Sequence, residues 1–259
     1  MKKFATILLL NLGIIGGMTN IAQGENAATA PDELTQVVAG IEEAANNQDL
    51  EGVISYYSQD FKNSDGLTTA TLEKALTQMW QNYSQLKYTT EIKSWSESGN
   101  ELVAETLTTI KGIQTNAGRQ AQLNSTIRSR QYFQGQKLVR QEILTERSQL
   151  TSGDNPPQVQ VVAPDTVTTG EKYNFDLIVD EPLGDQVLLG TIQEEKTAAN
   201  LYLNSASLEL EPLAAGGIYK VATAPTLPQS NWLSAILVRG DGITMITHRI
   251  NIKEKQAKQ

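Results

Sequence analysis

The chain has 259 residues, a formal net charge of −8 at pH 7, 39% hydrophobic residues and 19% charged residues. This composition is globular, so collagen-like, disordered and polytopic membrane proteins are excluded, and the acidic balance argues against a nucleic-acid binder. The sequence has no cysteine and one histidine, His248, which excludes disulfides, zinc-thiolate sites and thiol nucleophiles and disfavours a Ser-His-Asp triad. We therefore expect no metal site and no cofactor.

Residues 1–24 have the layout of a secretory signal peptide. Lys2 and Lys3 precede a mostly apolar run, and the segment ends in Ala22-Gln23-Gly24, with small residues at two positions of a cleavage site. The apolar run is shorter than the about 20 residues that a membrane-spanning helix needs. We expect an exported protein, periplasmic or extracellular, with no stable membrane span after cleavage. An uncleaved N-terminal anchor is the alternative.

Three amphipathic helices are predicted between residues 31 and 86. The first follows Pro31, the second is capped by Asp49 and runs to Phe61, and the turn Ser64-Asp65-Gly66 precedes the third. Their apolar positions recur at helical spacing. These positions are Leu34, Val37, Val38 and Ile41; Leu50, Val53, Ile54, Tyr57 and Phe61; and Leu72, Leu76, Met79, Trp80, Tyr83 and Leu86.

The pattern then changes to that of strands. Segments rich in Thr, Ile, Val and Tyr cover residues 88–95, 102–112, 120–133 and 137–147, and short turns separate them. Four sequential strands with short turns predict an antiparallel meander. Helices that precede such a sheet indicate an α+β fold with the helices on one sheet face.

Two stretches of this first half carry a more specific pattern. Residues 47–61 begin with a polar-Asp-hydrophobic entry and end in the acidic-aromatic pair Asp60-Phe61, and in residues 130–139 an aromatic strand turns through Gly135. With the element order, they make residues 31–150 resemble the nuclear transport factor 2-like family, which includes ketosteroid isomerase and SnoaL-like proteins with a cystatin-like α+β fold. The resemblance implies a three-helix cone with a curved antiparallel sheet, a pocket between them, and a homodimer formed through the sheet.

A second domain is expected after Gly153-Asp154-Asn155-Pro156-Pro157, which reads as a linker. About seven short strands follow, and their number resembles an immunoglobulin-like β-sandwich without its Cys-Trp-Cys signature. The predicted fold class is therefore α+β, a nuclear transport factor 2-like cone followed by an all-β sandwich. The expected limits are 1–24 for the signal peptide, 25–152 and 158–252 for the domains, 153–157 for the linker and 253–259 for a polar tail.

Two carboxylates are weak candidates for a general base. In the resembled family, isomerase-like members carry an acidic residue near the position of Asp65, and a buried carboxyl with a raised pKa suits proton abstraction. Asp65 also fits an ordinary turn, and an acidic-aromatic pair such as Asp60-Phe61 more often ends a helix than takes part in catalysis. His248 is interpreted as a surface strand residue.

A ligand site is the other candidate. Tyr57, Trp80 and Tyr83 could line a cavity, although their helical spacing also fits core packing. Arg128 and Arg130 share a strand face and could clamp an anion, or could form a ladder of opposite charges with the next strand.

Three hypotheses for function remain open. The first is an exported, non-enzymatic protein that binds a small ligand or an envelope partner through its first domain, with the sandwich as an interaction module. The second is an isomerase- or dehydratase-like enzyme using Asp65 or Asp60. The third is an envelope scaffold that binds a protein or a wall polymer through the sandwich.

Overall fold

The computed structural model describes residues 24–116, 118–181, 184, 186–204, 209–213 and 216–255. The predicted signal peptide lies outside these residues except for Gly24, and so does the end of the predicted polar tail, from residue 256. Within the described part of the chain, no helix is both long enough and apolar enough to cross a membrane.

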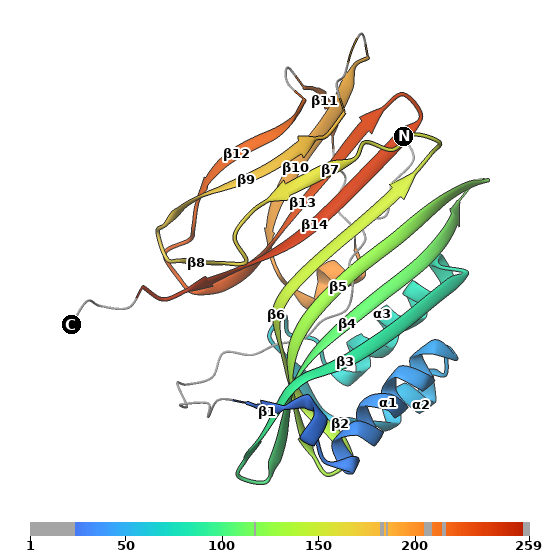
Figure 1. The fold of residues 1–259 in the computed structure, drawn as a ribbon, viewed down its shortest axis with the longest axis vertical. Helices are drawn as coiled ribbons and strands as arrows, with labels where there is room; N and C mark the ends of the chain where they lie inside the picture. Colours follow the sequence, from blue (N-terminus) through green and yellow to red (C-terminus); the bar gives the residue numbers. More distant parts are fainter. Residues whose placement is uncertain are drawn as a thin grey trace.

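The α-helices come early in the sequence, coloured blue to cyan in Figure 1, and strands make up most of the rest. The α-helices of the described residues are α1 (Asp32–Asn46), α2 (Leu50–Ser55) and α3 (Thr69–Asn82), and the 3-10 helices are η1 (Ala27–Thr29) and η2 (Ala199–Tyr202). The strands are β1 (Glu25–Asn26), β2 (Tyr57–Asn63), β3 (Gln85–Ser98), β4 (Glu101–Asn116), β5 (Arg119–Gln134), β6 (Lys137–Ser152), β7 (Val159–Val162), β8 (Thr166–Thr168), β9 (Lys172–Val179), β10 (Leu188–Lys196), β11 (Glu211–Pro212), β12 (Gly217–Thr223), β13 (Gln229–Arg239) and β14 (Gly242–Lys253).

One large sheet runs through both halves of the chain. Its strand order is β1-β3-β4-β5-β6-β14-β13-β10-β11, with β2 paired to β6 and β8 paired to β14. The junction is the antiparallel pair β6–β14, which runs from Ser152 opposite Ile243 to Arg147 opposite His248. A second sheet contains only β12, β9 and β7.

The predicted fold class is therefore wrong. A nuclear transport factor 2-like cone and a separate immunoglobulin-like sandwich would each have its own sheet, whereas here an eleven-stranded sheet crosses the predicted linker. The physical reason lies in β14, which is buried on both faces. Met245 belongs to the core beneath the helices, and Ile246 belongs to the core beneath the three-stranded sheet. The strand β14 thus contributes to both hydrophobic cores, and neither half of the chain forms its core without it.

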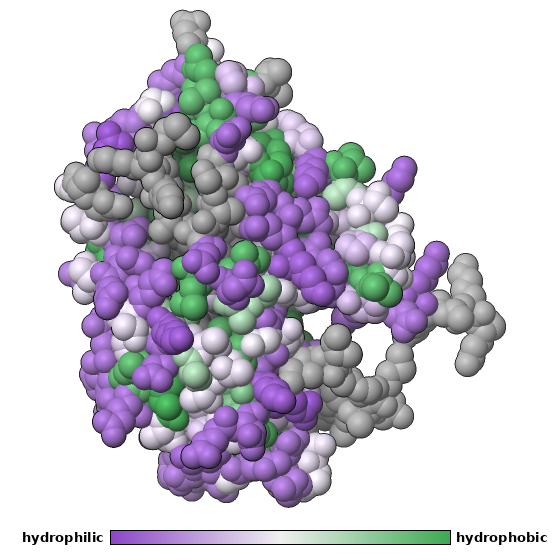
Figure 2. Space-filling model, turned by 180° about the vertical axis from the view of Figure 1, so that it is seen from behind, coloured by the Kyte–Doolittle hydropathy of each residue, from purple (hydrophilic) through white to green (hydrophobic). Residues whose placement is uncertain are grey.

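The two covering layers lie on opposite faces of the large sheet. The helices pack on one face of β3–β6, with Leu34, Leu72 and Ile127 in that core. The three-stranded sheet packs on the other face over β14, β13 and β10, with Phe175 and Leu233 in that core. Seen from behind, the molecule is mostly hydrophilic and its hydrophobic side chains form small separate patches (Figure 2).

The start of each helix follows from its local sequence. Asp32 and Glu33 occupy the first turn of α1, and Asp49 caps α2 by accepting a hydrogen bond from Gly52 N at 2.9 Å. The capping box of Thr68 and Thr71 begins α3.

The predicted extent of the second helix is wrong. It ends at Ser55, and Tyr57–Asn63 form β2, which pairs in parallel with β6. Phe61 and Asn63 are both buried while Lys62 between them is exposed, which is the alternation of a half-buried strand.

Candidate functional site

Asp65 is held by a buried arginine. It lies in the turn between β2 and α3, and its side chain is 0% exposed. Arg249 of β14 donates two hydrogen bonds to its carboxylate, from Nη1 to Oδ1 at 3.0 Å and from Nη2 to Oδ2 at 2.6 Å. The Tyr202 hydroxyl of η2 also donates to Oδ2. The carboxylate thus points neither into a cavity nor to solvent.

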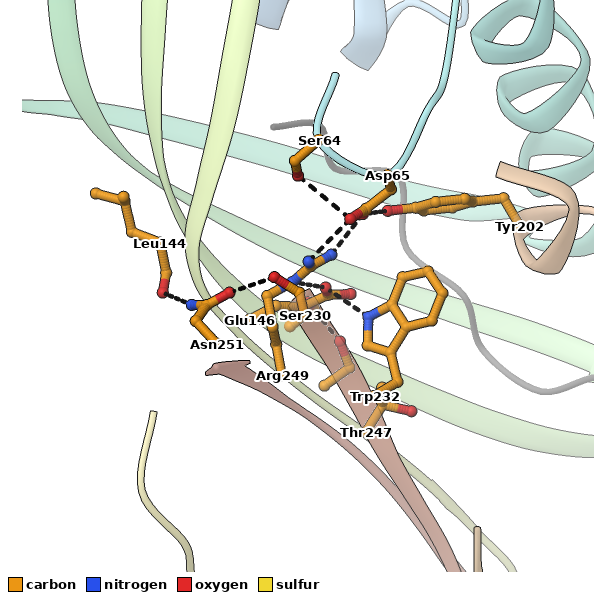
Figure 3. A network of polar contacts seen from close by, with 12 residues as sticks. Ser64, Asp65, Leu144, Glu146, Tyr202, Ser230, Trp232, Thr247, Arg249 and Asn251 are labelled. Atoms are coloured by element: carbon orange, nitrogen blue, oxygen red, sulfur yellow. Dashed lines mark hydrogen bonds and ion pairs between the residues drawn. The ribbon is translucent and has the colours of Figure 1, made fainter. Parts of the chain in front are cut away.

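The same guanidinium contacts a second carboxylate. Arg249 Nε donates to Glu146 Oε2 of β6 at 3.0 Å, and the indole Nε1 of Trp232 donates to the same oxygen at 2.9 Å. Arg249 lies between Asp65 and Glu146, and Tyr202 and Trp232 flank it (Figure 3). We call these five residues the buried ion cluster. It joins the β2–α3 turn, β6, η2, β13 and β14.

Burial and charge set the protonation of this cluster. Burial raises the pKa of Glu146, and the nearby Asp65 charge adds to this, against the lowering effect of Arg249 and the Trp232 hydrogen bond. Burial alone would lower the pKa of Arg249, but Asp65 and Glu146 outweigh it, so the pKa is raised and the guanidinium stays charged. Burial also raises the pKa of Tyr202 well above its usual value. Asp65 therefore has a permanent cation as its partner.

Asp60, the other candidate base, lies elsewhere. It is exposed on β2, where its backbone N–H donates to the Ser58 hydroxyl at 3.3 Å. The structure does not bring Asp60 and Asp65 together. The catalytic role of either carboxylate stays a prediction.

A small cavity lies between the helices and the sheet. Its volume is about 100 Å³. Most of its lining is apolar, and Tyr57 is the one candidate ligand residue among those that line it. The lining residues are Val38, Ile41, Glu42, Ala45, Val53, Tyr57, Leu72, Leu76, Met79, Tyr88, Thr90, Thr108, Ile110, Gln131 and Gln141. Burial raises the pKa of Tyr57, so its hydroxyl stays protonated.

The polar groups of the cavity lie mainly on the sheet side. Gln131 and Gln141 are opposite each other on β5 and β6, and Gln141 Nε2 donates to the Ser129 hydroxyl at 2.8 Å. Glu42 of α1 accepts a hydrogen bond from Thr90 N at 2.6 Å. The cavity therefore offers carboxamide and hydroxyl groups against an apolar wall.

The other candidate ligand residues lie outside this lining. Tyr83 is buried at the end of α3, and the indole of Trp80 donates to the Tyr88 hydroxyl at 3.2 Å. Arg128 and Arg130 lie on the sheet face opposite the helices and pair with Glu105 at 2.7 Å each. Of the five candidate ligand residues, Tyr57 alone lines this cavity, and a ligand role for the other four stays a prediction.

The arginines belong to a cross-strand ladder. Arg130 also pairs with Glu142 of β6 at 3.1 Å. Burial alone would raise the pKa of Glu105, but its hydrogen bonds from Arg130 and Arg128 outweigh this and lower it. These ion pairs form a cross-strand ladder of opposite charges, which is the alternative to an anion clamp.

The last strand, β14, carries two buried polar residues, His248 and Arg249, whose burial the sequence interpretation did not predict. His248 is 1% exposed and its Nε2 lies 3.0 Å from Pro164 O, so the expected surface position is wrong. The reason is that the sheet of β7, β9 and β12 covers the face of β14 on which it lies, with Phe175 of β9 against the imidazole. Arg249 was not singled out, although a charged residue between Ile246 and Ile250 in a strand is an available signal of a buried ion pair.

The model of a domain of unknown function (DUF8623) matches residues 154–253, a segment that contains Tyr202, Trp232 and Arg249. No curated protein matches the chain.

Three solved structures show limited similarity. Bd1075 from Bdellovibrio bacteriovorus is 19% identical with a TM-score of 0.31; the match covers 42% of this chain and 38% of that one. A loop-truncation variant of IdmH is 12% identical with a TM-score of 0.30, over 42% of this chain and 89% of that one. AclR, a putative hydroxylase from Streptomyces galilaeus, is 17% identical with a TM-score of 0.33, over 44% and 89%. Similarities with TM-scores this low identify neither a fold nor a function for this chain.

Proposed function

We propose that the protein is an exported, non-enzymatic binding protein that holds a small, slender ligand in the cavity between the helices and the sheet. The observation that carries this proposal is the lining: an apolar wall from the three helices faces the carboxamide of Gln131 on the sheet.

The size of the cavity limits the ligand. Drug-sized ligands occupy pockets of roughly 300–1,000 Å³, and an engineered cavity of about 150 Å³ takes benzene. The cavity here, at about 100 Å³, fits part of an aliphatic chain and excludes a fused ring system. Glu42 lies in the wall, so a neutral polar end such as a hydroxyl suits it better than a carboxylate.

The enzymatic alternative has less support. A general base needs a free carboxylate beside the bound substrate. Asp65 is paired with Arg249 and does not line the cavity, and Asp60 is exposed on β2. Homodimerisation through the sheet, and a partner protein or wall polymer bound by residues 158–252, stay predictions.

Filling the cavity tests the proposal. Straight-chain alcohols from butanol to decanol are titrated against the protein and binding is followed by calorimetry. Ala45→Met places three further heavy atoms at the cavity wall, so we expect at least a tenfold weaker affinity for the alcohol that the wild type binds best. Ala39→Met is the matched control, because Ala39 is exposed on the same helix and does not line the cavity. If no alcohol binds the wild type, or if Ala45→Met binds as tightly, the proposal is wrong.

A further inference from the structure

The sheet face that turns away from the helices carries an open groove of about 710 Å³. Strands β3–β6 form its floor, and Gln158, next to β7, contributes to one wall. Most of its side chains are long and polar, and they include Gln85, Lys87, Lys111, Gln122, Asn124 and Gln149. The groove is separate from the cavity, since no residue lines both.

The strand register places these side chains in two rows. Lys87, Lys111, Asn124 and Gln149 lie directly opposite one another on β3, β4, β5 and β6. The neighbouring row is Gln85, Ile113, Gln122 and Thr151. Residues two apart on a strand share a face, so the two rows form one continuous floor that is polar except at Ile113.

The charge of this floor is unbalanced. Lys87 and Lys111 face each other across neighbouring strands, where like charges about 4.5–5.5 Å apart at Cβ are destabilising. Among the described residues neither lysine makes an ion pair, and no acidic residue lines the groove. Elsewhere on this sheet face Arg130 pairs with Glu105 and Arg140 with Glu101, and the whole chain has a net charge of −8. An anion bound between the lysines would supply the missing charge.

We propose that this groove binds an acidic oligosaccharide, a chain of sugars that bear carboxylate groups. Each carboxamide of Gln85, Gln122, Asn124 and Gln149 can donate and accept hydrogen bonds, which suits the paired hydroxyls of a sugar ring. The lysine pair supplies the charge for a carboxylate.

Other polyanions and partners fit the groove less well. Among the described residues that line it none is aromatic, whereas single-stranded nucleic acid is bound by aromatic stacking platforms on basic proteins. Protein interfaces are likewise anchored by aromatic side chains. The groove offers hydrogen bonds and two positive charges without such an anchor.

A charge-removing variant tests the proposal on the full chain. A hexamer of galacturonic acid and a neutral galactose hexamer are titrated against the wild type and Lys87→Gln/Lys111→Gln at low salt. We expect the wild type to bind the acidic hexamer at least tenfold more tightly than the neutral one, and the double variant to lose that preference. Added salt weakens the binding of the acidic hexamer, because exposed charges are screened.

Two controls separate this site from general charge effects. Lys74→Gln/Lys172→Gln removes two exposed lysines outside the groove, and it should bind the acidic hexamer like the wild type. Poly-glutamate tests charge without sugar and should bind at least tenfold more weakly than the acidic hexamer. The proposal is overturned if the wild type binds no acidic hexamer, if the groove variant binds it unchanged, or if poly-glutamate binds equally well.

Discussion

Arg249 is 0% exposed and pairs with two carboxylates at once. Breaking a buried ion pair by removing one partner costs about 3–5 kcal/mol, because the remaining charge is left unpaired. Arg249→Met removes the charge and keeps most of the volume, so we expect a loss of about this size in the free energy of unfolding, measured by urea denaturation. Arg147→Met is the control, since Arg147 is half exposed and pairs with Asp165 at 2.9 Å; its loss should stay below about 1 kcal/mol. Equal losses in the two variants would contradict the structural role given to the cluster.

Glu146 gives the same cluster a pH dependence. Its pKa in the folded state is raised above the usual value of 4.5. As pH rises above about 4.5, the unfolded chain loses this proton while the folded protein keeps it, so folding becomes less favourable until the folded pKa is passed. We expect the wild type to lose stability relative to Glu146→Gln over this rise in pH, measured by urea denaturation at successive pH values.

Glu105 provides a contrast of opposite sign. Its hydrogen bonds from Arg130 and Arg128 outweigh its burial and lower its pKa, so it stabilises the folded protein above the usual pKa of 4.5 and this contribution is lost as pH falls. Relative to Glu105→Gln, the wild type should therefore lose stability on acidification. The difference in unfolding free energy between the wild type and each variant is plotted against pH. If the curves for Glu146→Gln and Glu105→Gln slope in the same direction, the assigned pKa directions are wrong.

The partners of Arg249 could not be predicted from the sequence. They are 184 residues away at Asp65 and 103 residues away at Glu146. The turn and the family resemblance make Asp65 a candidate general base, yet its carboxylate serves as a buried counter-ion. The pairings of β6 with β14 and of β2 with β6 bring the three charges together, and no local pattern encodes these pairings.

At the scale of elements, the start of α3 allows a direct test. The Thr68 side chain accepts from Thr71 N and the Thr71 hydroxyl accepts from Thr68 N, so both form a capping box. Thr68→Ala should reduce the free energy of unfolding by about 1 kcal/mol. Thr77 is half-buried in the interior of the same helix and its hydroxyl donates to Glu73 O, so Thr77→Ala should be neutral or slightly stabilising. A loss at Thr77 equal to that at Thr68 would contradict the capping role.

Elements with a strong local pattern could be predicted, and those that depend on distant pairing could not. The apolar spacing of Leu34, Val37 and Val38 identifies α1, and Gly135, with φ of 54°, marks the β5–β6 turn. Tyr57 and Phe61 are four apart, which fits a helix, while Phe61 and Asn63 are two apart, which fits a strand. Pairing with β6, about 80 residues later, decides for the strand.

For the whole molecule, the predicted linker is packed against the end of the sheet. A side chain at Gly153, where φ is +90°, would place its Cβ 2.3 Å from Asp241 O, and one at Gly242 would place it 2.1 Å from Asn155 O. Thr244 Oγ1 also donates to Pro157 O at 2.7 Å. These contacts, the β6–β14 pairing and the buried ion cluster join the two halves, although a Gly-Pro-rich segment in sequence favours a flexible boundary.

We therefore expect both halves to unfold as one cooperative unit. Because β14 contributes Met245 to one core and Ile246 to the other, its release would open both cores together. Hydrogen exchange measured by mass spectrometry should give the slowest amides of β4–β5 and of β9 and β13 the same free energy of opening, equal to that of global unfolding. The Arg249→Met variant should lower both values by the same amount. If residues 158–252 instead exchange through a separate opening of lower free energy, then they form an independent folding unit, and the shared strand does not couple the two cores.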